Sequence, residues 1–584
     1  MGDLLIFYIG KKTMNSNETT AFIEKLQSIV GKKHTLTDPA RTLFYRQGTR
    51  FGKGDALAVV LPGTLVEQWH VLKACVEADV IVITQSANTG LTGGSTPDGN
   101  DYDRPIVIVS TRRLDGINVI ENGEQVVCLP GSTLFRLEKE LKKYKRGPHS
   151  VIGSSCIGAS VMGGVCNNSG GALIQHGPAY TQMAVFAQLD AQGKLQLVNH
   201  LGIELGNDPD TILQNLQNHN YSDKDIQRDA GLGHDHDYCD HVRQIDADTP
   251  ARYNADPARH YEASGSAGRL MVFAVRLDTF PLEENTAVFY IGTNNTNELD
   301  DIRRHILGQF KNLPVSGEYI HRDAFDIAAV YGKHLFLAIQ KLGTDTIPKM
   351  YALKNFVDRI MSKIPCFSGS FSDKFAVTVC KLWPNHLPKS LRDYRDRYAH
   401  HLILKMSDEG IAEAEAFLKS YFDNSSAAEK RDGSYFRCNN KEAEAAMLHR
   451  FAVAGAATVY RNVHTKTVED LVALDIALRR NDKDWFETLP ESISQHFIYK
   501  LYYGHFFCSV FHQDYIAKKG TDCSKVEEEM LAILDQRGAQ YPAEHNVGHL
   551  YHANEDLKKF YHALDPTNSF NPGIGKTSKK KYWQ

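Results

Sequence analysis

The 584-residue sequence lacks the features that would place it in several common classes. No run approaches the roughly 20 apolar residues needed to cross a bilayer. The ten cysteines contain no CxxC pair and are too sparse for a disulfide scaffold, which indicates reduced thiols in a cytosolic setting. The net charge is −4, so the whole chain is not a nucleic-acid-binding polycation, and we expect no nucleic-acid partner.

Two common nucleotide-binding motifs are also missing. No G-x-G-x-x-G of the Rossmann type is present, and neither is a Walker A motif. These absences argue against NAD as a cofactor and against a P-loop NTPase. Repeats and low-complexity tracts are absent too, so the length predicts a globular protein of several domain-sized units.

The N-terminal stretch MGDLLIFYIG is a short apolar run. It lacks a basic region and an Ala-x-Ala cleavage site, so we do not predict a signal peptide. A polar leader and an amphipathic helical pattern follow Met14, which suggests Met14 as the native start; the choice between Met1 and Met14 stays open.

The first half of the chain alternates strand-like and helix-like patterns. Strands are predicted at 56–61, 80–84, 105–110, 125–129 and 269–277, with helices at 65–78 and 133–143. After about residue 280 the pattern changes. It predicts a strand at AVFYI, a helix at LDDIRRHILGQF, and longer helices at 440–455 and 466–480.

Two segments rich in small residues carry the strongest chemical signal. Residues 86–95 (SANTGLTGGS) form a loop whose glycine backbone can turn several N–H groups toward an anion such as a diphosphate. An ordinary surface loop is an equal alternative for this segment alone. Residues 147–171 form a second such segment, able to lie flat against a planar ligand or to pack tightly between strands. Together they favour a bound dinucleotide.

These segments resemble the FAD-binding domain of the VAO/PCMH flavoprotein family. The resemblance is closer still to its bacterial respiratory, quinone-dependent D-lactate dehydrogenases, and extends from about Thr20 to the C-terminus. The stretches that carry it include GDALAVVLPGTL, ANTGLTGGSTPDGNDYDR, PHSVIGSSCIGASVMGGVCNNSGG, ADTPARYNADP, LHRFAVAGAA, ALDIALRRND, KLYYGHFFCSVFHQDY, RGAQYPAEHNVGHLY and DPTNSFNPGIGKTSK.

The resemblance implies an α+β fold with a discontinuous VAO/PCMH-type FAD-binding domain, an α+β cap domain and a basic membrane-facing module. Residues 1–280 and 530–584 would form the FAD-binding domain. Residues 281–320 and 398–529 would form the cap. Residues 321–397, with a segment near 425–450, would form the membrane-binding module.

The resemblance also implies a set of residues that bind non-covalent FAD. In the first glycine-rich segment they are Ser86, Ala87, Asn88, Thr89, Gly90, Gly94 and Ser95. In the second segment they are Gly153, Ser160 and Gly170, and Val272 would contact FAD through its backbone. An interior strand valine usually belongs to the core, so the role of Val272 depends on the resemblance alone.

Oxidation of a 2-hydroxy acid needs a cation for the carboxylate and a base for the hydroxyl proton. By the resemblance, Arg450 matches the arginine that binds the substrate carboxylate in related 2-hydroxyacid flavoenzymes. From the sequence, an ordinary arginine on a helix surface is an equally good interpretation. His545, after Glu544, is our first choice for the base because the pKa of histidine lies near working pH. His505 and His512 are further site candidates. Their odd spacing places them on opposite faces of a straight strand, so we expect no metal.

The function implied is FAD-dependent oxidation of D-lactate to pyruvate by an oxidoreductase of the respiratory chain that passes electrons to quinone. The first alternative is a flavin dehydrogenase of another 2-hydroxy acid, such as D-2-hydroxyglutarate or glycolate. The second is a non-catalytic membrane-associated binding protein on a decayed flavin scaffold, against which the intact glycine-rich segments argue.

Residues 333–405 carry 13 Lys/Arg and 5 Asp/Glu, a balance of +8. Apolar residues are interleaved: Ile347, Met350, Tyr351, Phe356, Phe367, Phe371, Leu382 and Trp383. This mixture favours contact with an anionic lipid surface, whereas a solvated basic face would explain the charge alone. With the resemblance, it predicts a peripheral protein on the cytoplasmic side of the inner membrane.

Overall fold

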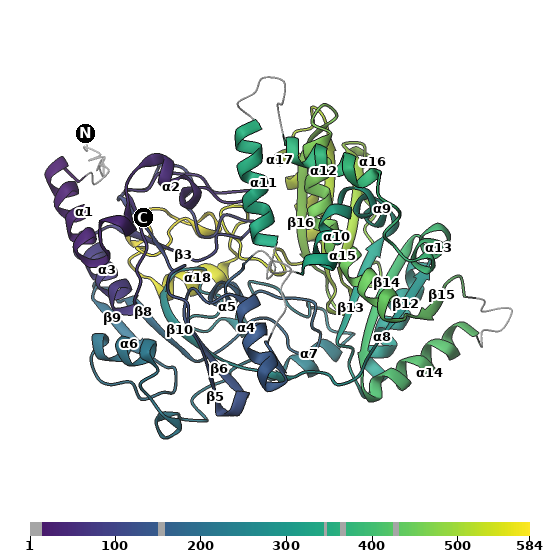
Figure 1. Cartoon of the computed structure of the whole chain (residues 1–584), viewed down its shortest axis with the longest axis horizontal. Helices are drawn as coiled ribbons and strands as arrows, with labels where there is room; N and C mark the ends of the chain where they lie inside the picture. The colour runs from purple at the N-terminus through teal and green to yellow at the C-terminus, as the bar shows by residue number, and fades with distance from the viewer. Residues whose placement is uncertain (1–13, 150–157, 344–346, 362–369, 424–430) are drawn as a thin grey trace, which may run out of the picture.

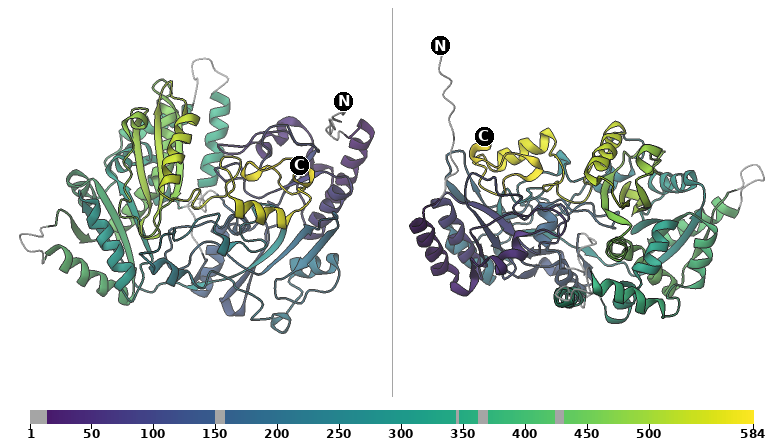
Figure 2. Two further views of the ribbon diagram at one scale, coloured as in Figure 1. Left: turned by 180° about the vertical axis from the view of Figure 1, so that it is seen from behind. Right: turned by 90° about the horizontal axis from the view of Figure 1, so that it is seen from above.

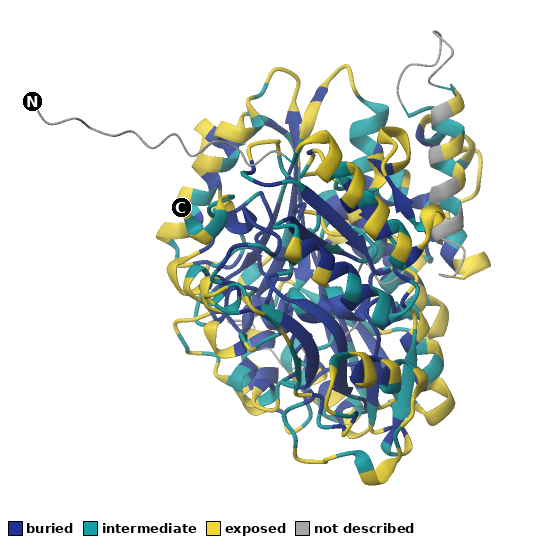
Figure 3. Cartoon of the chain, turned by 90° about the vertical axis from the view of Figure 1, so that its left-hand side faces the viewer, coloured by how far each residue is buried: buried dark blue, intermediate teal, exposed yellow. Residues whose placement is uncertain are grey.

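A computed structural model of the chain describes residues 14–149, 158–343, 347–361, 370–423 and 431–584. Residues 1–13, which the choice between Met1 and Met14 concerns, lie outside this part of the chain, and so does the predicted FAD ligand Gly153. Two lobes stand side by side in Figure 1, the first built around the N-terminal sheets and the second around a large C-terminal sheet. Buried residues concentrate on the strands, and exposed ones on outer helix faces and loops (Figure 3).

The first lobe contains a four-stranded sheet in the order β1-β2-β4-β3. Its strands are β1 (Thr35–Leu36), β2 (Ala58–Val60), β3 (Ile81–Gln85) and β4 (Ile106–Ser110). Strands β2, β3 and β4 run parallel, and their uninterrupted apolar sequences suit a sheet covered on both faces. Helices α1 (Ser16–Val30) and α3 (Leu65–Glu77) contribute to the core on one side.

A five-stranded antiparallel sheet completes the first lobe, in the order β5-β6-β10-β8-β9. Its strands are β5 (Ile117–Ile120), β6 (Gln125–Cys128), β8 (Ala184–Leu189), β9 (Leu195–Asn199) and β10 (Met271–Asp278). Helices α4 (Leu134–Leu141), α5 (Val161–Cys166) and α6 (Pro209–Asn218) surround it, and β7 (Arg146–Gly147) pairs with β11 (Phe280–Pro281). The central strand β10 is buried along nearly its whole length.

The C-terminal segment returns to the first lobe, where both views of Figure 2 place it. The Val82 amide donates to the Ser569 carbonyl, and the Asn571 amide donates to the Val82 carbonyl, each at 2.9 Å. The Asn571 side chain donates to the carbonyls of Gly94 and Ala267 at 2.8 Å. The last residues of the chain therefore hold the first glycine-rich loop in place.

The second lobe is built on a seven-stranded antiparallel sheet in the order β15-β12-β14-β13-β17-β18-β16. Its strands are β12 (Thr286–Thr293), β13 (Ser316–His321), β14 (His400–Ser407), β15 (Ser434–Arg437), β16 (Val468–Ala477), β17 (Phe497–His505) and β18 (Val510–Lys518). Segments predicted as separate parts of the cap thus pair edge to edge in one sheet. The domain boundaries themselves remain predictions.

Helices cover both faces of this sheet. The core on one face includes α8 (Thr296–Gln309), α14 (Glu409–Asp423) and α17 (Cys523–Gln536). The core on the other includes α9 (Arg322–Tyr331), α13 (Lys389–Arg397) and α15 (Asn440–Val463). Helices α10 (Lys333–Leu342), α11 (Ile347–Met361) and α12 (Phe371–Lys381) occupy the basic segment.

Most predicted elements of the first lobe agree with the structure to within two residues, but the helix predicted at 466–480 is wrong. Residues Val468–Ala477 form strand β16, paired with β18. The sequence VEDLVALDIA fits a helical apolar spacing, but it also alternates through its second half. Pairing with β18 decides in favour of the strand, because contacts distant in sequence outweigh a weak local preference.

We predict that Phe570→Ala lowers the free energy of unfolding by about 3–5 kcal/mol, the usual cost of truncating a buried aromatic side chain. Phe570 is 1% exposed and packs in the core beneath β3. Urea denaturation measures the change. The matched control, Phe44→Ala, alters a side chain that is 54% exposed and should cost less than about 1 kcal/mol. Equal losses in the two variants would contradict the structural role of the C-terminal return.

Candidate active site

A cavity of about 920 Å³ is lined by residues of both lobes. Its walls come from the glycine-rich loop, α5 and β10 of the first lobe, and from β13, α15, β16, β17 and β18 of the second. The loop that contains Glu544 and His545 contributes as well. Every predicted site residue within the described part of the chain lines this one cavity; Gly153 is outside that part.

The first glycine-rich loop presents unpaired backbone donors. Within the described residues, no hydrogen bond is donated by the backbone N–H groups of residues 87–94. The Asn88 side chain donates to the carbonyls of Phe44 and Gln47, and Ser86 donates to the Pro130 carbonyl. These side chains hold the loop from within. Its backbone amides are therefore free to bind an anion, as in other amide nests.

Glycine positions and one orphaned hydroxyl agree with a cofactor in this cavity. A Cβ atom added at Gly90 would meet nothing within 4 Å, so this glycine borders open space. At Gly94 it would come within 2.3 Å of the Asn546 side chain. The buried Thr84 hydroxyl lines the cavity and has no hydrogen-bond partner among the described residues. Small residues, free amides and a free hydroxyl suit the phosphates and sugar of a dinucleotide.

Two predicted FAD ligands also have structural tasks of their own. The Ser160 side chain caps α5 by accepting from the Gly163 amide at 3.0 Å. A Cβ atom at Gly170 would come within 2.6 Å of Glu544 Oε1, so this glycine makes room for the Glu544 carboxylate. Val272 is buried in β10 beside a register shift between Val272 and Ala274.

A buried carboxylate, Glu318 of β13, organises the second-lobe side of the cavity. Arg450 of α15 places Nη2 at 2.9 Å from Glu318 Oε2. His505, at the end of β17, places Nδ1 at 2.6 Å from Glu318 Oε1. Arg450 also stacks over the Tyr503 ring, with 4.6 Å from its guanidinium carbon to the ring centre. Arg450 is thus a buried, oriented cation and not a helix-surface residue.

A second group of contacts surrounds Glu544. Its carboxylate pairs with buried Arg252 and lies 3.4 Å from His505 Nε2 and 3.7 Å from His512 Nε2. The Glu544 amide donates to Asp475 at 2.7 Å. Asp475 also lies 3.2 Å from His512 Nδ1 and 3.6 Å from His545 Nδ1. All five predicted catalytic residues therefore belong to one continuous charged cluster.

The cluster changes the protonation of its members. Burial by itself would lower the pKa of His505, but Glu318 and Glu544 outweigh it and raise that pKa to about 10. Burial would raise the pKa of Glu544, yet His505 and Arg252 hold it well below its usual value. The pKa of Glu318 is likewise lowered by His505 and Arg450 against the effect of burial. At neutral pH the cluster therefore contains a charged His505 between two carboxylates.

The expectation about His505 and His512 was wrong in its geometry. The two residues flank a hairpin, in which β17 ends at His505 and β18 begins at Val510. Their side chains, with Glu544, offer ligand atoms within 4.8 Å of one another. Two imidazoles and a carboxylate at this spacing suit one divalent ion. The structure thus removes the geometric argument against a metal.

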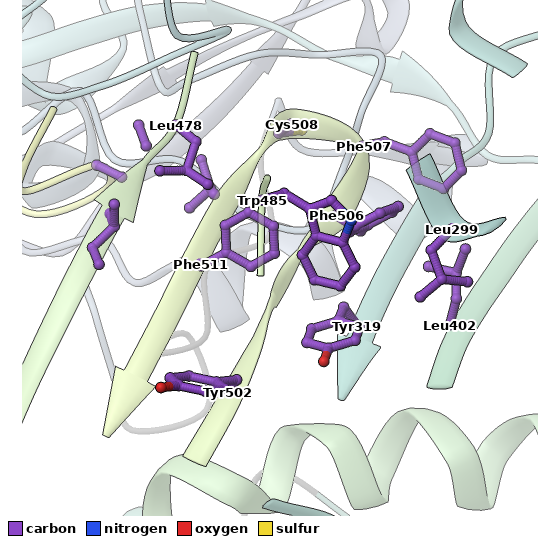
Figure 4. Packing of buried hydrophobic residues seen from close by; sticks show 14 of the residues in the cluster. Leu299, Tyr319, Leu402, Leu478, Trp485, Tyr502, Phe506, Phe507, Cys508 and Phe511 are labelled. Carbon is purple, nitrogen blue, oxygen red and sulfur yellow. The ribbon is translucent and has the colours of Figure 1, made fainter. Parts of the chain in front are cut away.

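Aromatic packing fixes this hairpin. In Figure 4, Trp485 lies against Phe506 of the turn and Phe511 of β18. The Trp485 and Phe511 rings stack with centres 5.6 Å apart, and the Tyr319 ring meets Trp485 edge-on at 4.9 Å. The residues between the two histidines thus form a core that sets where His505 and His512 emerge.

Sequence reasoning missed three charged members of the cluster: Arg252, Glu318 and Asp475. Arg252 and Asp475 lie in ADTPARYNADP and ALDIALRRND, two stretches that carry the family resemblance. Glu318 is a lone acid in the buried strand SGEYIH. A charge in an otherwise buried strand requires a partner, which is the signal that could have found it.

A family model and two solved structures define the cofactor domain and the fold. Residues 56–199 match the family model described as "FAD binding domain". The chain is similar to p-cresol methylhydroxylase, with a TM-score of 0.57 at 12% identity over 97% of this chain and 98% of that one. An alkyldihydroxyacetonephosphate synthase gives a TM-score of 0.57 at 11% identity over 96% and 86%. The fold is therefore the predicted α+β VAO/PCMH type, and the glycine-rich loop and α5 of the cavity wall lie within the matched FAD-binding domain.

Sequence comparisons then define the family. Residues 288–583 match the model "D-lactate dehydrogenase, membrane binding". The chain is 64% identical over 561 residues to a quinone-dependent D-lactate dehydrogenase of Haemophilus influenzae, covering 96% of this chain and 99% of that protein. It is 58% identical over 572 residues to the Escherichia coli protein of the same name, covering 98% and 99%. This chain belongs to the family of quinone-dependent D-lactate dehydrogenases.

Within the described part of the chain, none of the helices is both long enough and apolar enough to cross a bilayer.

We predict that His505 makes stability fall with rising pH. Its folded pKa lies above the unfolded value of 6.5, so the stabilisation is complete below pH 6.5 and is lost as pH rises through about 10. Urea unfolding in the presence of EDTA, repeated from pH 6.5 to 10, measures this loss. The loss should be smaller in His505→Gln than in the wild type, although the variant is less stable overall. If the free energy of unfolding fell equally with pH in the wild type and in His505→Gln, His505 would not be held as a cation.

Proposed function

We propose that this protein oxidises D-lactate to pyruvate with non-covalently bound FAD and passes the electrons to membrane quinone. One observation carries the proposal: the first glycine-rich loop, in the FAD-binding domain, and the charged cluster that contains Arg450 and His545 line the same cavity. Family membership supplies the substrate and the acceptor. Bound FAD would accept the hydride from the substrate carbon.

Arg450 is the proposed carboxylate-binding residue. Glu318 and the Tyr503 ring orient its guanidinium, and its Nε atom has no hydrogen-bond partner among the described residues. A guanidinium held in this way can donate two hydrogen bonds to a substrate carboxylate.

His545 is the proposed base. His505 and His512 each have both ring nitrogens directed at carboxylates. For His545 the described residues provide one polar contact, Asp475 at 3.6 Å from Nδ1. Asp475 can orient the ring and stabilise its protonated form while the other nitrogen takes the hydroxyl proton. His545 is 33% exposed in the structure, consistent with access from the cavity.

Anaerobic mixing with candidate substrates tests the proposed function. D-lactate should bleach the flavin absorbance, at roughly 450 nm for an FAD enzyme, faster than L-lactate, glycolate or D-2-hydroxyglutarate. Short-chain quinone should then restore the colour. Faster bleaching by D-2-hydroxyglutarate or glycolate would favour one of these acids as the substrate. A purified protein without flavin colour would favour the non-catalytic binding protein.

His545→Ala should slow flavin reduction by D-lactate by about 10²-fold or more, the usual contribution of a general base. Reduction by dithionite should stay unchanged, because it requires the cofactor but no base. His512→Ala is the matched control and should have a smaller effect. If His512→Ala shows the larger loss, the base is His512.

The basic segment is the proposed contact with an anionic lipid surface on the cytoplasmic side of the inner membrane. Leu382 is 86% and Trp383 53% exposed at the end of α12, and Phe356 and Phe375 are exposed as well. Lys341 stacks over Trp383 at 4.7 Å. Exposed lysines beside exposed aromatic groups suit a lipid interface. Phe367 and the side chains of Ile347 and Tyr351 lie outside the described part of the chain.

The combined variant Lys341→Gln, Lys374→Gln, Lys381→Gln should bind anionic vesicles more weakly, since each basic residue near the surface contributes about 1 kcal/mol. Lys354 is left unchanged because it pairs with buried Asp373. Vesicle sedimentation measures binding, and D-lactate oxidation with a soluble dye should persist. Lys32→Gln, Lys33→Gln, Lys194→Gln is the control with equal charge change. Equal binding of the two triple variants would rule out this surface.

A further inference from the structure

One face of helix α15 extends along the cavity well beyond the charged cluster. The cavity-lining residues of this helix are Met447, Arg450, Phe451, Ala454, Gly455, Thr458 and Arg461. Their spacing of three or four residues keeps them on one side of the helix. From the first to the last, the helix rises about 21 Å at 1.5 Å per residue. The cavity therefore continues far past Arg450.

The chemistry of the wall changes along this face. At Arg450 the cavity borders Glu318 and His505. Further along the helix, toward its C-terminal end, the wall is formed by what we call the apolar arm, consisting of Leu335 on α10 and Phe451, Ala454, Gly455 and Thr458 on α15. A Cβ atom at Gly455 would lie 3.3 Å from Leu335, so the glycine lets α10 approach closely. The wall of the arm is mostly apolar and is formed by two helices that pack against each other.

D-lactate does not account for the apolar arm. It is a three-carbon acid, and its carboxylate requires the charged end of the cavity. The proposed FAD-binding residues lie in the first lobe, whereas both helices of the arm belong to the second. The arm therefore fits another ligand, one that is apolar and reaches the same cofactor.

Helix α10 connects the arm to the exposed apolar surface. Leu335 lines the arm, Ile339 packs against Leu335 and Phe451, and Leu342 at the end of the helix is 60% exposed. Trp383 lies alongside this helix, with its ring against Lys341 and its carbonyl accepting from Lys333 Nζ at 2.7 Å, and Leu382 beside it is exposed. In Figure 1, α10 lies beside α15 and α12 in the second lobe. An apolar ligand could pass from a lipid surface to the cavity along this helix.

We propose that the apolar arm binds the ring of a membrane isoprenoid quinone, an inference that rests on the proposed function. The Thr458 hydroxyl and Arg461, which pairs with Asp470 at 2.8 Å, provide polar groups for the quinone oxygens. The two electrons and two protons removed from D-lactate are those that convert quinone to quinol. The flavin would carry the electrons between the two ends of one cavity.

Ala454→Trp tests the arm directly, because Ala454 is exposed within the cavity and its replacement would fill the space. The assay uses a water-soluble short-chain ubiquinone in detergent without vesicles, so that membrane binding plays no part. The KM for quinone should rise at least about tenfold, while anaerobic flavin reduction by D-lactate and turnover with ferricyanide stay within about twofold.

Ala416→Trp is the matched control, since Ala416 is an exposed helical alanine on α14 that does not line the cavity. It should behave as the wild type with every acceptor. Unchanged quinone kinetics in Ala454→Trp would overturn the proposal. A parallel loss of flavin reduction by D-lactate would overturn it too, because the arm would then belong to the substrate path.

Photolabelling gives a second measurement that needs no variant. An azido-ubiquinone should attach to peptides from Lys333–Leu342 or Asn440–Val463 of the wild-type holoenzyme, and excess quinone should prevent labelling. Labelling elsewhere would overturn the inference even if Ala454→Trp failed to fold. If D-lactate does not reduce the flavin of the wild-type protein, the proposed function is contradicted. In that case the position of the label alone tests whether the apolar arm binds quinone.

Discussion

The pairing of buried charges between the two lobes is the constraint on which the site depends. Glu318, Glu544 and Asp475 are all buried, and a buried carboxylate without a partner is very costly. Arg252, Arg450 and the charged His505 neutralise them. Because these residues come from both lobes, the lobes cannot separate without exposing or orphaning these charges.

The two lobes contribute different kinds of groups to the cavity. The first lobe provides backbone amides and small residues, which suit a cofactor whose phosphates need many weak donors. The second lobe provides Arg450, held by Glu318, and Asp475, beside which His545 of the C-terminal loop lies. The cofactor and the substrate would meet where the two lobes face each other. Precise positioning of these groups is what reduces the cost of reaching the transition state.

Helix α15 connects the charged cluster to the helices of the proposed membrane-contact surface. It is 24 residues long, begins with the Asn439 capping box and carries Arg450 near its middle. Its buried alanines and valines pack against the large sheet, while its other face borders the cavity. Helix α10 packs across it and ends at exposed apolar residues. A single rigid helix thus spans the distance from the charged cluster to the apolar arm.

The sequence by itself determined the family, the FAD-binding segments and most elements of the first lobe, because glycine-rich loops and apolar strands are local signals. The resemblance also led to the prediction of Arg450, Glu544 and His545 as site residues, and all three line the one cavity. Local pattern could not decide between helix and strand for Val468–Ala477, nor place His505 and His512 on two strands of a hairpin. Only tertiary structure brought Glu318, Asp475 and Arg252 to these residues, because buried charges are paired by contacts between segments far apart in the chain.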